Sequence, residues 1–121
     1  MENKKTLVLG ASTEPTRYAY LAANSLVTHG HPIVNVGLKT GMVAGVAIER
    51  PEKIHPDIDT ITLYISPENQ PALYNYILAT QPKRIIFNPG SENQTLQQLA
   101  VAQGISIDYA CTLVLLATGQ F

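Results

Sequence analysis

The sequence predicts a single α/β domain, residues 1–121, with a five-stranded, mostly parallel sheet and helices on both faces, which makes three layers. Short apolar runs recur along the chain, and each ends in glycine, proline or a polar residue. Continuous apolar runs are typical of strands buried on both faces, and segments of helical periodicity separate most of them. A chain of this length buries about two thirds of its unfolded surface, so it needs no disulfide or metal to fold.

The first strand is predicted at residues 6–10, followed by a helix. Ser12 and Thr13 are good N-cap residues, and Pro15 suits a first turn. One apolar stripe follows at helical spacing, and Gly30 ends the helix. The stripe consists of Ala19, Ala22, Ala23, Leu26 and Val27.

The second and third strands are predicted at residues 33–37 and 60–65. Between them, glycines and prolines interrupt residues 38–59, so no regular crossover helix is expected there. These punctuating residues are Gly41, Gly45, Pro51 and Pro56.

The second helix is predicted at residues 68–80, with Leu73, Tyr76 and Ile77 on one side, and the fourth strand at residues 84–87. Ser91 then suits the cap of a third helix, which bears Leu96, Leu99 and Ala100 and ends at Gly104. A fifth strand is predicted at residues 105–108. The apolar tail, residues 111–121, fits a helix and a strand equally well.

Composition excludes several classes of protein. Apolar residues make up 45% of the chain and charged ones 14%, with a net charge of −1. Because charged residues are few, part of the surface is expected to be covered by a ligand or by a second copy of the chain. A homodimer is therefore one of the possible states. No basic run indicates nucleic acid or an anionic membrane as a partner. No segment suits a signal peptide or a membrane helix, which predicts a cytoplasmic protein.

In a parallel sheet, ligands bind outside the carboxyl ends of the strands, where the strand order reverses. All five predicted ends are rich in small, proline or polar residues and carry no carboxylate. They are Gly10-Ala11-Ser12, Gly37-Leu38-Lys39, Ile65-Ser66-Pro67, Asn88-Pro89-Gly90 and Tyr109-Ala110-Cys111.

The first of these loops resembles an incomplete dinucleotide fingerprint. That fingerprint is G-x-G-x-x-G, whereas this chain has Gly10, Ser12 and Pro15 at the three positions. A following helix still offers free N–H groups to a phosphate, and Ser12 and Thr13 add hydroxyl donors. The alternative is that these two residues only cap the helix.

Two cations accompany this loop. Lys39 follows the second strand, where an NAD site would need an acidic residue, and a lysine there suits a ribose phosphate such as that of coenzyme A or NADP. Arg17, expected on the first helical turn, can turn its donors toward a pyrophosphate. The alternative for each residue is an ordinary surface position, which is the commoner position for a lysine and is as compatible with Arg17 as a ligand contact. Tyr18 and Tyr20 either line the cleft or pack.

No catalytic constellation appears in the sequence. Cys111, the single cysteine, is expected to be a buried inert thiol, with a reactive thiol at a helix start as the alternative. His29, His31 and His55 lack metal-ligand spacing and are interpreted as structural or surface groups. No nucleophile elbow, paired carboxylates or P-loop is present. We therefore expect a binding site without catalysis.

An ordered set of segments resembles the small bacterial CoA-binding proteins, relatives of the CoA-binding domain of the succinyl-CoA ligase alpha subunit. These segments are residues 8–12, 37–39, 59–64, 86–90 and 111–113. The resemblance implies a Rossmann-like fold that binds coenzyme A or an acyl-CoA. It implies that Gly10, Ala11, Ser12 and Thr13 face the phosphates, that Lys39 contacts a phosphate, and that Ile65, Ser66 and Pro67 flank the coenzyme.

The predicted cofactor-binding residues also include Arg17, Gly37, Asn88 and Gly90 at the same edge. Glu14 departs from the ligase pattern, because it places a negative charge beside the expected phosphates. The ligase keeps its phosphorylated histidine in a second domain, so its reaction is not expected here. Two alternatives remain: a small NADP-dependent reductase or a subunit of one, and a thiol regulator in which Cys111 forms a mixed disulfide with CoA.

Overall fold

The computed structural model of the chain describes residues 3–121. Within these residues the chain forms seven strands, four α-helices and two 3₁₀ turns. In order they are β1 (Thr6–Leu9), α1 (Tyr18–Thr28), β2 (Ile33–Val36), β3 (Met42–Val43), β4 (Val46–Glu49), β5 (Thr60–Leu63), η1 (Pro67–Asn69), η2 (Pro71–Leu73), α2 (Tyr74–Thr80), β6 (Arg84–Phe87), α3 (Gln94–Ala102), β7 (Ser106–Tyr109) and α4 (Thr112–Ala117).

The strands form one sheet in the order β3-β4-β2-β1-β5-β6-β7. Every neighbouring pair is parallel except β3 with β4. The chain moves outward from β1 to β2 and later returns to the other side of β1 at β5, so the strand order reverses between β1 and β5. This is a Rossmann-like α/β fold, as expected, but with seven strands instead of five.

The two extra strands form a hairpin inside the segment in which the sequence predicted no helix. β3 and β4 pair antiparallel across Ala44 and Gly45, both with positive φ, +53° and +79°. Two positive φ values match the right-handed twist of the strands. The expectation of five strands was wrong here because the hairpin is short and an alanine, not a glycine or asparagine, takes the first turn position.

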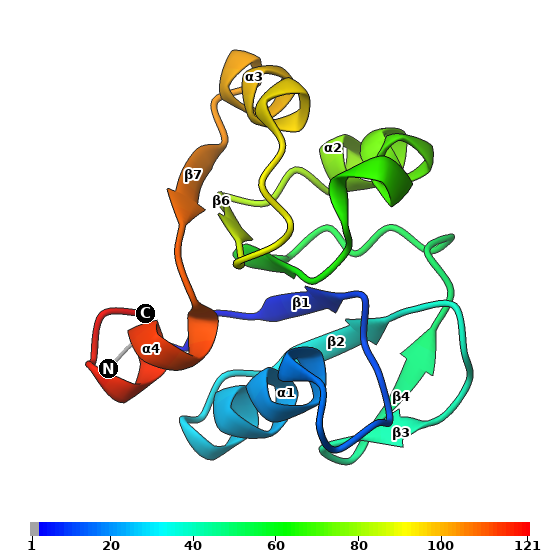
Figure 1. The fold of residues 1–121 in the computed structure, drawn as a ribbon, viewed down its shortest axis with the longest axis vertical. Coiled ribbons are helices and arrows are strands. Elements are labelled where there is room, and N and C mark those ends of the chain that lie inside the picture. Colours follow the sequence, from blue (N-terminus) through cyan, green and yellow to red (C-terminus); the bar gives the residue numbers. More distant parts are fainter. Residues whose placement is uncertain (1–2) are drawn as a thin grey trace.

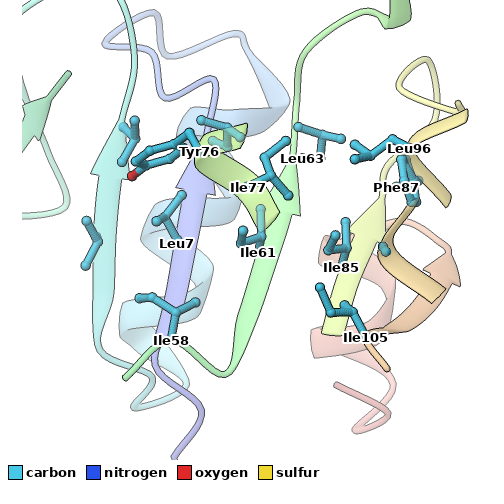
Figure 2. Packing of buried hydrophobic residues seen from close by; sticks show 14 residues of the cluster. Leu7, Ile58, Ile61, Leu63, Tyr76, Ile77, Ile85, Phe87, Leu96 and Ile105 are labelled. Carbon is cyan, nitrogen blue, oxygen red and sulfur yellow. The ribbon is translucent and has the colours of Figure 1, made fainter. Parts of the chain in front are cut away.

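Two apolar layers hold the helices to the sheet. α2 and α3 cover one face and α1 and α4 the other (Figure 1). The larger layer joins the alternating side chains of β1, β2, β5 and β6 to α2 and α3, as Figure 2 shows. Its members include Leu7, Leu9, Ile61, Leu63, Ile77, Ile85, Phe87 and Leu96, each 0 or 1% exposed.

The helix stripes are confirmed in their main residues and wrong at two positions. Ala19, Ala22, Ala23 and Leu26 are buried in α1, but Val27 is 43% exposed. Adjacent residues of a helix project about 100° apart, and the neighbouring Leu26, 0% exposed, takes the direction toward the sheet, which leaves Val27 at the margin of the stripe. Leu99 is 39% exposed because α3 packs on the edge strand β7.

Two helix starts also differ from prediction. Asn93 caps α3, accepting the Leu96 N–H at 3.1 Å, whereas Ser91 donates its hydroxyl to the Asn88 carbonyl. The second helix begins at Tyr74, because residues 67–73 form two 3₁₀ turns, each opened by a proline. The tail forms helix α4. Among residues 3–121, none of the helices is long and apolar enough to cross a membrane.

A buried histidine at the amino-terminal edge of the sheet makes stability depend on pH. His31 is 5% exposed, and its Nδ1 accepts the Lys4 N–H at 3.0 Å while its ring packs on Phe121. Burial lowers the pKa of His31, helped by the charges of His29, Lys4 and Arg84. The folded chain therefore favours neutral His31, while the unfolded chain takes up a proton near pH 6.5.

We expect the free energy of unfolding to be highest above pH 6.5 and to fall as the pH drops toward the lowered pKa of His31. Urea unfolding between pH 7.5 and pH 5 measures this. The His31→Asn variant should lose part of the decline, whereas His29→Asn, which alters an exposed histidine, should keep most of it. Identical profiles for the wild type and His31→Asn would contradict the assignment.

Candidate functional site

A pocket of about 250 Å³ lies where the strand order reverses, at the carboxyl ends of β1 and β5. The loops after β1, β5 and β6 and the first residues of α1 form its walls. Its lining residues are Gly10, Ser12, Arg17, Tyr18, Ala19, Tyr64, Ile65, Ser66, Pro89, Gly90 and Ser91. Ligands of open α/β sheets bind at this position.

The loop after β1 is longer than the sequence predicted. α1 begins at Tyr18 with Arg17 as its N-cap, so Ser12 and Thr13 do not cap the helix and Pro15 lies outside it. The Ser12 hydroxyl instead accepts the Glu14 N–H at 3.1 Å, and the Arg17 N–H bonds the Glu14 carbonyl. These local bonds add a turn between strand and helix, which displaces the helix start by several residues.

The start of α1 therefore faces the pocket without a cap. The side chain of the N-cap residue, Arg17, makes no hydrogen bond to the first N–H groups of α1. The first turn of α1 holds no acidic residue. Arg17, Tyr18 and Ala19 line the pocket. A free helix N-terminus with a nearby arginine favours an anion.

Close backbone contacts hold this loop against its neighbours. Gly10 has φ of +96°, and a Cβ there would come within 2.5 Å of the Tyr64 carbonyl oxygen. At Gly37, a Cβ would come within 2.7 Å of the Ala11 carbonyl oxygen. The loop after β1 is therefore in close backbone contact with the ends of β5 and β2. Only glycine at positions 10 and 37 permits these two contacts.

Four predicted residues lie on the β2 side of this loop and not in the pocket. Ala11 and Gly37 make the contact just described. Thr13 is exposed and close to Gly41, where a Cβ would come within 2.5 Å of its methyl group. Lys39 is exposed in the turn before β3. These residues continue the carboxyl edge of the sheet beside the pocket.

The loop after β5 brings Ile65 and Ser66 into the pocket. Pro67 does not line it, because this residue begins the turn η1 and leads the chain toward α2. Burial raises the pKa of the neighbouring Tyr64 to about 12, so its phenol stays protonated at neutral pH.

Asn88 has a structural position that the sequence did not indicate. It is 2% exposed, and its Nδ2 donates to Thr62 Oγ1 and the Leu63 carbonyl while its Oδ1 accepts the Thr112 N–H. Its amide is occupied within the fold and does not line the pocket. Gly90, which belongs to the same predicted strand end as Asn88, does line the pocket. Its N–H donates to Glu92 Oε1 at 2.8 Å.

The carboxyl edge of the sheet carries a carboxylate at a strand end that is not among the five predicted ones. Glu49 ends β4, a strand that was not predicted, and pairs with His55 at 3.0 Å. It lies two strands from β1, outside the pocket lining. Within the lining, Arg17 is the only charged side chain among the described residues.

Sequence reasoning missed four lining residues, Ala19, Tyr64, Pro89 and Ser91. Ala19 was assigned to the buried helix stripe, and Pro89 belonged to a predicted strand end but not to the predicted contacts. Tyr64 follows β5 directly, so its position after a buried strand was a usable signal. Ser91 was assigned to a helix cap, because a hydroxyl before a helix suits a cap as well as it suits a pocket lining. Tyr18, for which lining and packing were both open, lines the pocket and is 68% exposed.

Comparison with solved structures finds the same architecture in other proteins. The crystal structure of an uncharacterized protein is 50% identical, covers 100% of both chains and has a TM-score of 0.97. Cell-free ID.343 from Thermus thermophilus is 20% identical over 98% of this chain and 91% of that one, with a TM-score of 0.84, and shows the fold alone. A hypothetical protein from Pyrococcus horikoshii OT3 is 26% identical over 89% of this chain and 75% of that one, with a TM-score of 0.77.

Comparison with protein families identifies the chain. No curated protein matches it. Residues 4–117, which include every strand and every lining residue of the pocket, match the model of a family described as CoA binding domain. A match over nearly the whole chain, together with a pocket at the switch point of the sheet, shows that the chain belongs to this family of CoA-binding domains.

Proposed function

We propose that the protein binds coenzyme A or an acyl-CoA at the pocket and catalyses no reaction on it. The observation that carries the proposal is the uncapped start of α1, which opens into a pocket lined by Arg17 and by the hydroxyl-bearing residues Ser12 and Ser66. Backbone N–H groups, hydroxyls and a guanidinium are the donors that a pyrophosphate accepts.

The remaining features of the edge fit the same ligand. Lys39, beside the first loop, supplies a cation for a ribose phosphate. The phenol of Tyr64, whose pKa burial raises to about 12, is uncharged at neutral pH and adds no negative charge beside the phosphates.

Calorimetric titration with CoA, dephospho-CoA and NADP tests the ligand. We expect CoA to bind, dephospho-CoA to bind more weakly, and Lys39→Ala to remove most of that difference. Absence of CoA binding at millimolar concentration would overturn the proposal. Binding of NADPH without CoA, detected by its fluorescence, would instead favour the reductase.

The contribution of Arg17 is tested by the Arg17→Ala variant. We expect CoA to bind about tenfold more weakly, because a charge-assisted hydrogen bond contributes about 1.5–3 kcal/mol and part of it is screened at this exposed position. Arg50→Ala is the matched control, since Arg50 is also exposed but lies outside the pocket lining. Equal affinities in the two variants would remove Arg17 from the site.

A further inference from the structure

Gln70 is a fully buried amide that lies behind the pocket, between the loops that form two of its walls. Its exposure is 0%, and it is not one of the lining residues. It joins the turns η1 and η2, which Pro67 and Pro71 begin. Because proline fixes φ, the backbone on both sides of Gln70 is restricted.

The Gln70 side chain joins the two loops through one nitrogen. Its Nε2 donates to the Ile65 carbonyl at 2.8 Å and to the Ser91 carbonyl at 2.7 Å. Ile65 follows β5 and Ser91 follows β6, and both line the pocket. The separation of the two carbonyls is therefore fixed by the two hydrogens of a single amide group.

A second amide orients the first. Asn93 Nδ2 donates to Gln70 Oε1 at 2.9 Å and to the Tyr74 hydroxyl at 2.8 Å, while its Oδ1 caps α3. The donor on Asn93 fixes which end of the Gln70 amide is the oxygen. The starts of α2 and α3 and both pocket loops thus share one hydrogen-bonded unit, made of Gln70, Tyr74 and Asn93.

We propose that Gln70 is a positioning residue that sets the separation of the loops after β5 and β6 and thereby the affinity of the pocket for its ligand. A leucine or methionine would fill the same volume, but only an amide supplies two donors and an acceptor together. The effect on affinity rests on the proposed function, whereas the effect on the loops does not. Binding groups must be held within about 0.5 Å of their working geometry, so a loosened wall weakens binding.

The loops are tested first, without ligand, in the Gln70→Met variant. Methionine preserves length and volume but leaves the two carbonyls without their donor. Amide hydrogen exchange should become about tenfold faster in residues 65–69 and 89–92, with little change in β1 and α1. Unchanged exchange, or an increase spread evenly over the chain, would overturn the proposal.

Calorimetric titration with CoA then tests affinity. We expect about tenfold weaker binding to Gln70→Met than to the wild type. Thr80→Val is the control, because Thr80 is also buried and bonds the Tyr76 carbonyl, but it ends α2 away from the pocket. This control should lose stability and keep its affinity. Equal losses of affinity in both variants would assign Gln70 a general structural role and overturn the proposal.

The two experiments separate this proposal from the proposed function. If the wild type fails to bind CoA, the proposed function fails, and the exchange measurement still decides whether Gln70 positions the loops. If Gln70→Met does not fold, Asn93→Ser replaces it, since serine retains a good helix cap but removes the donor to Gln70 Oε1. Faster exchange in the same two loops would support the proposal, and unchanged exchange would overturn it.

Discussion

Gly10→Ala is expected to destabilise the protein by about 3 kcal/mol or more and to reduce the folded population. A positive φ costs an alanine about 1 kcal/mol, and a close steric overlap in a packed region costs about 1–3 kcal/mol more. The overlap here is with backbone, the Tyr64 carbonyl at 2.5 Å, which cannot rotate away as a side chain can. Urea unfolding of the variant measures the loss.

Gly45→Ala separates the two contributions. Gly45 also has positive φ, +79°, but nothing lies within 4 Å of a Cβ placed there. We expect this variant to lose only about 1 kcal/mol, the conformational part. If Gly10→Ala proves as stable as Gly45→Ala, the loop after β1 is not in close contact with the end of β5 as described.

Asn88→Ala is expected to destabilise the protein by about 3–4 kcal/mol, because each buried partner left without a hydrogen bond costs about 1–3 kcal/mol. The Thr62 hydroxyl keeps its bond to the Thr112 hydroxyl, so the partners that bear the loss are the Leu63 carbonyl and the Thr112 N–H. The last of these belongs to the first residue of α4, so the variant should also loosen that helix. Urea unfolding gives the stability, and amide hydrogen exchange locates the loosening.

The control for this variant is Asn75→Ala, which removes an exposed asparagine from α2. Its effect should stay within about 0.5 kcal/mol, as is usual for surface positions. A loss below 1 kcal/mol in Asn88→Ala, or exchange in α4 equal to that of the wild type, would show that the Asn88 amide does not hold α4 to the sheet.

The sequence predicted the parallel part of the fold because burial on both faces leaves a strong signal. The runs around Leu7, Val34, Ile61 and Ile85 are mostly apolar or β-branched, and each ends close to a residue that terminates a strand. The hairpin β3–β4 left no such signal, since an alanine with positive φ is the turn residue least expected from sequence. The start of α1 was misplaced because a serine before a helix favours both a cap and a local turn.

The parts of the candidate site that depend on where the strands end could be predicted from the sequence. Strand ends are found from sequence, and of the residues named there Gly10, Ser12, Ile65 and Gly90 line the pocket. Side-chain direction is not found in this way, and a polar residue at a strand end suits a ligand and an internal hydrogen bond equally well. Asn88 illustrates the second case, and only its three bonds within the fold distinguish the two.

The hairpin has a consequence for self-association. Parallel sheets expose rows of unpaired backbone groups at their outer strands, and a long flat outer strand can recruit a strand from another molecule. On the side of β2, the outermost strand is β3, which pairs through only two residues and turns back sharply at Ala44 and Gly45. An incoming strand would find almost no template there, so this end of the sheet is protected against edge-to-edge aggregation.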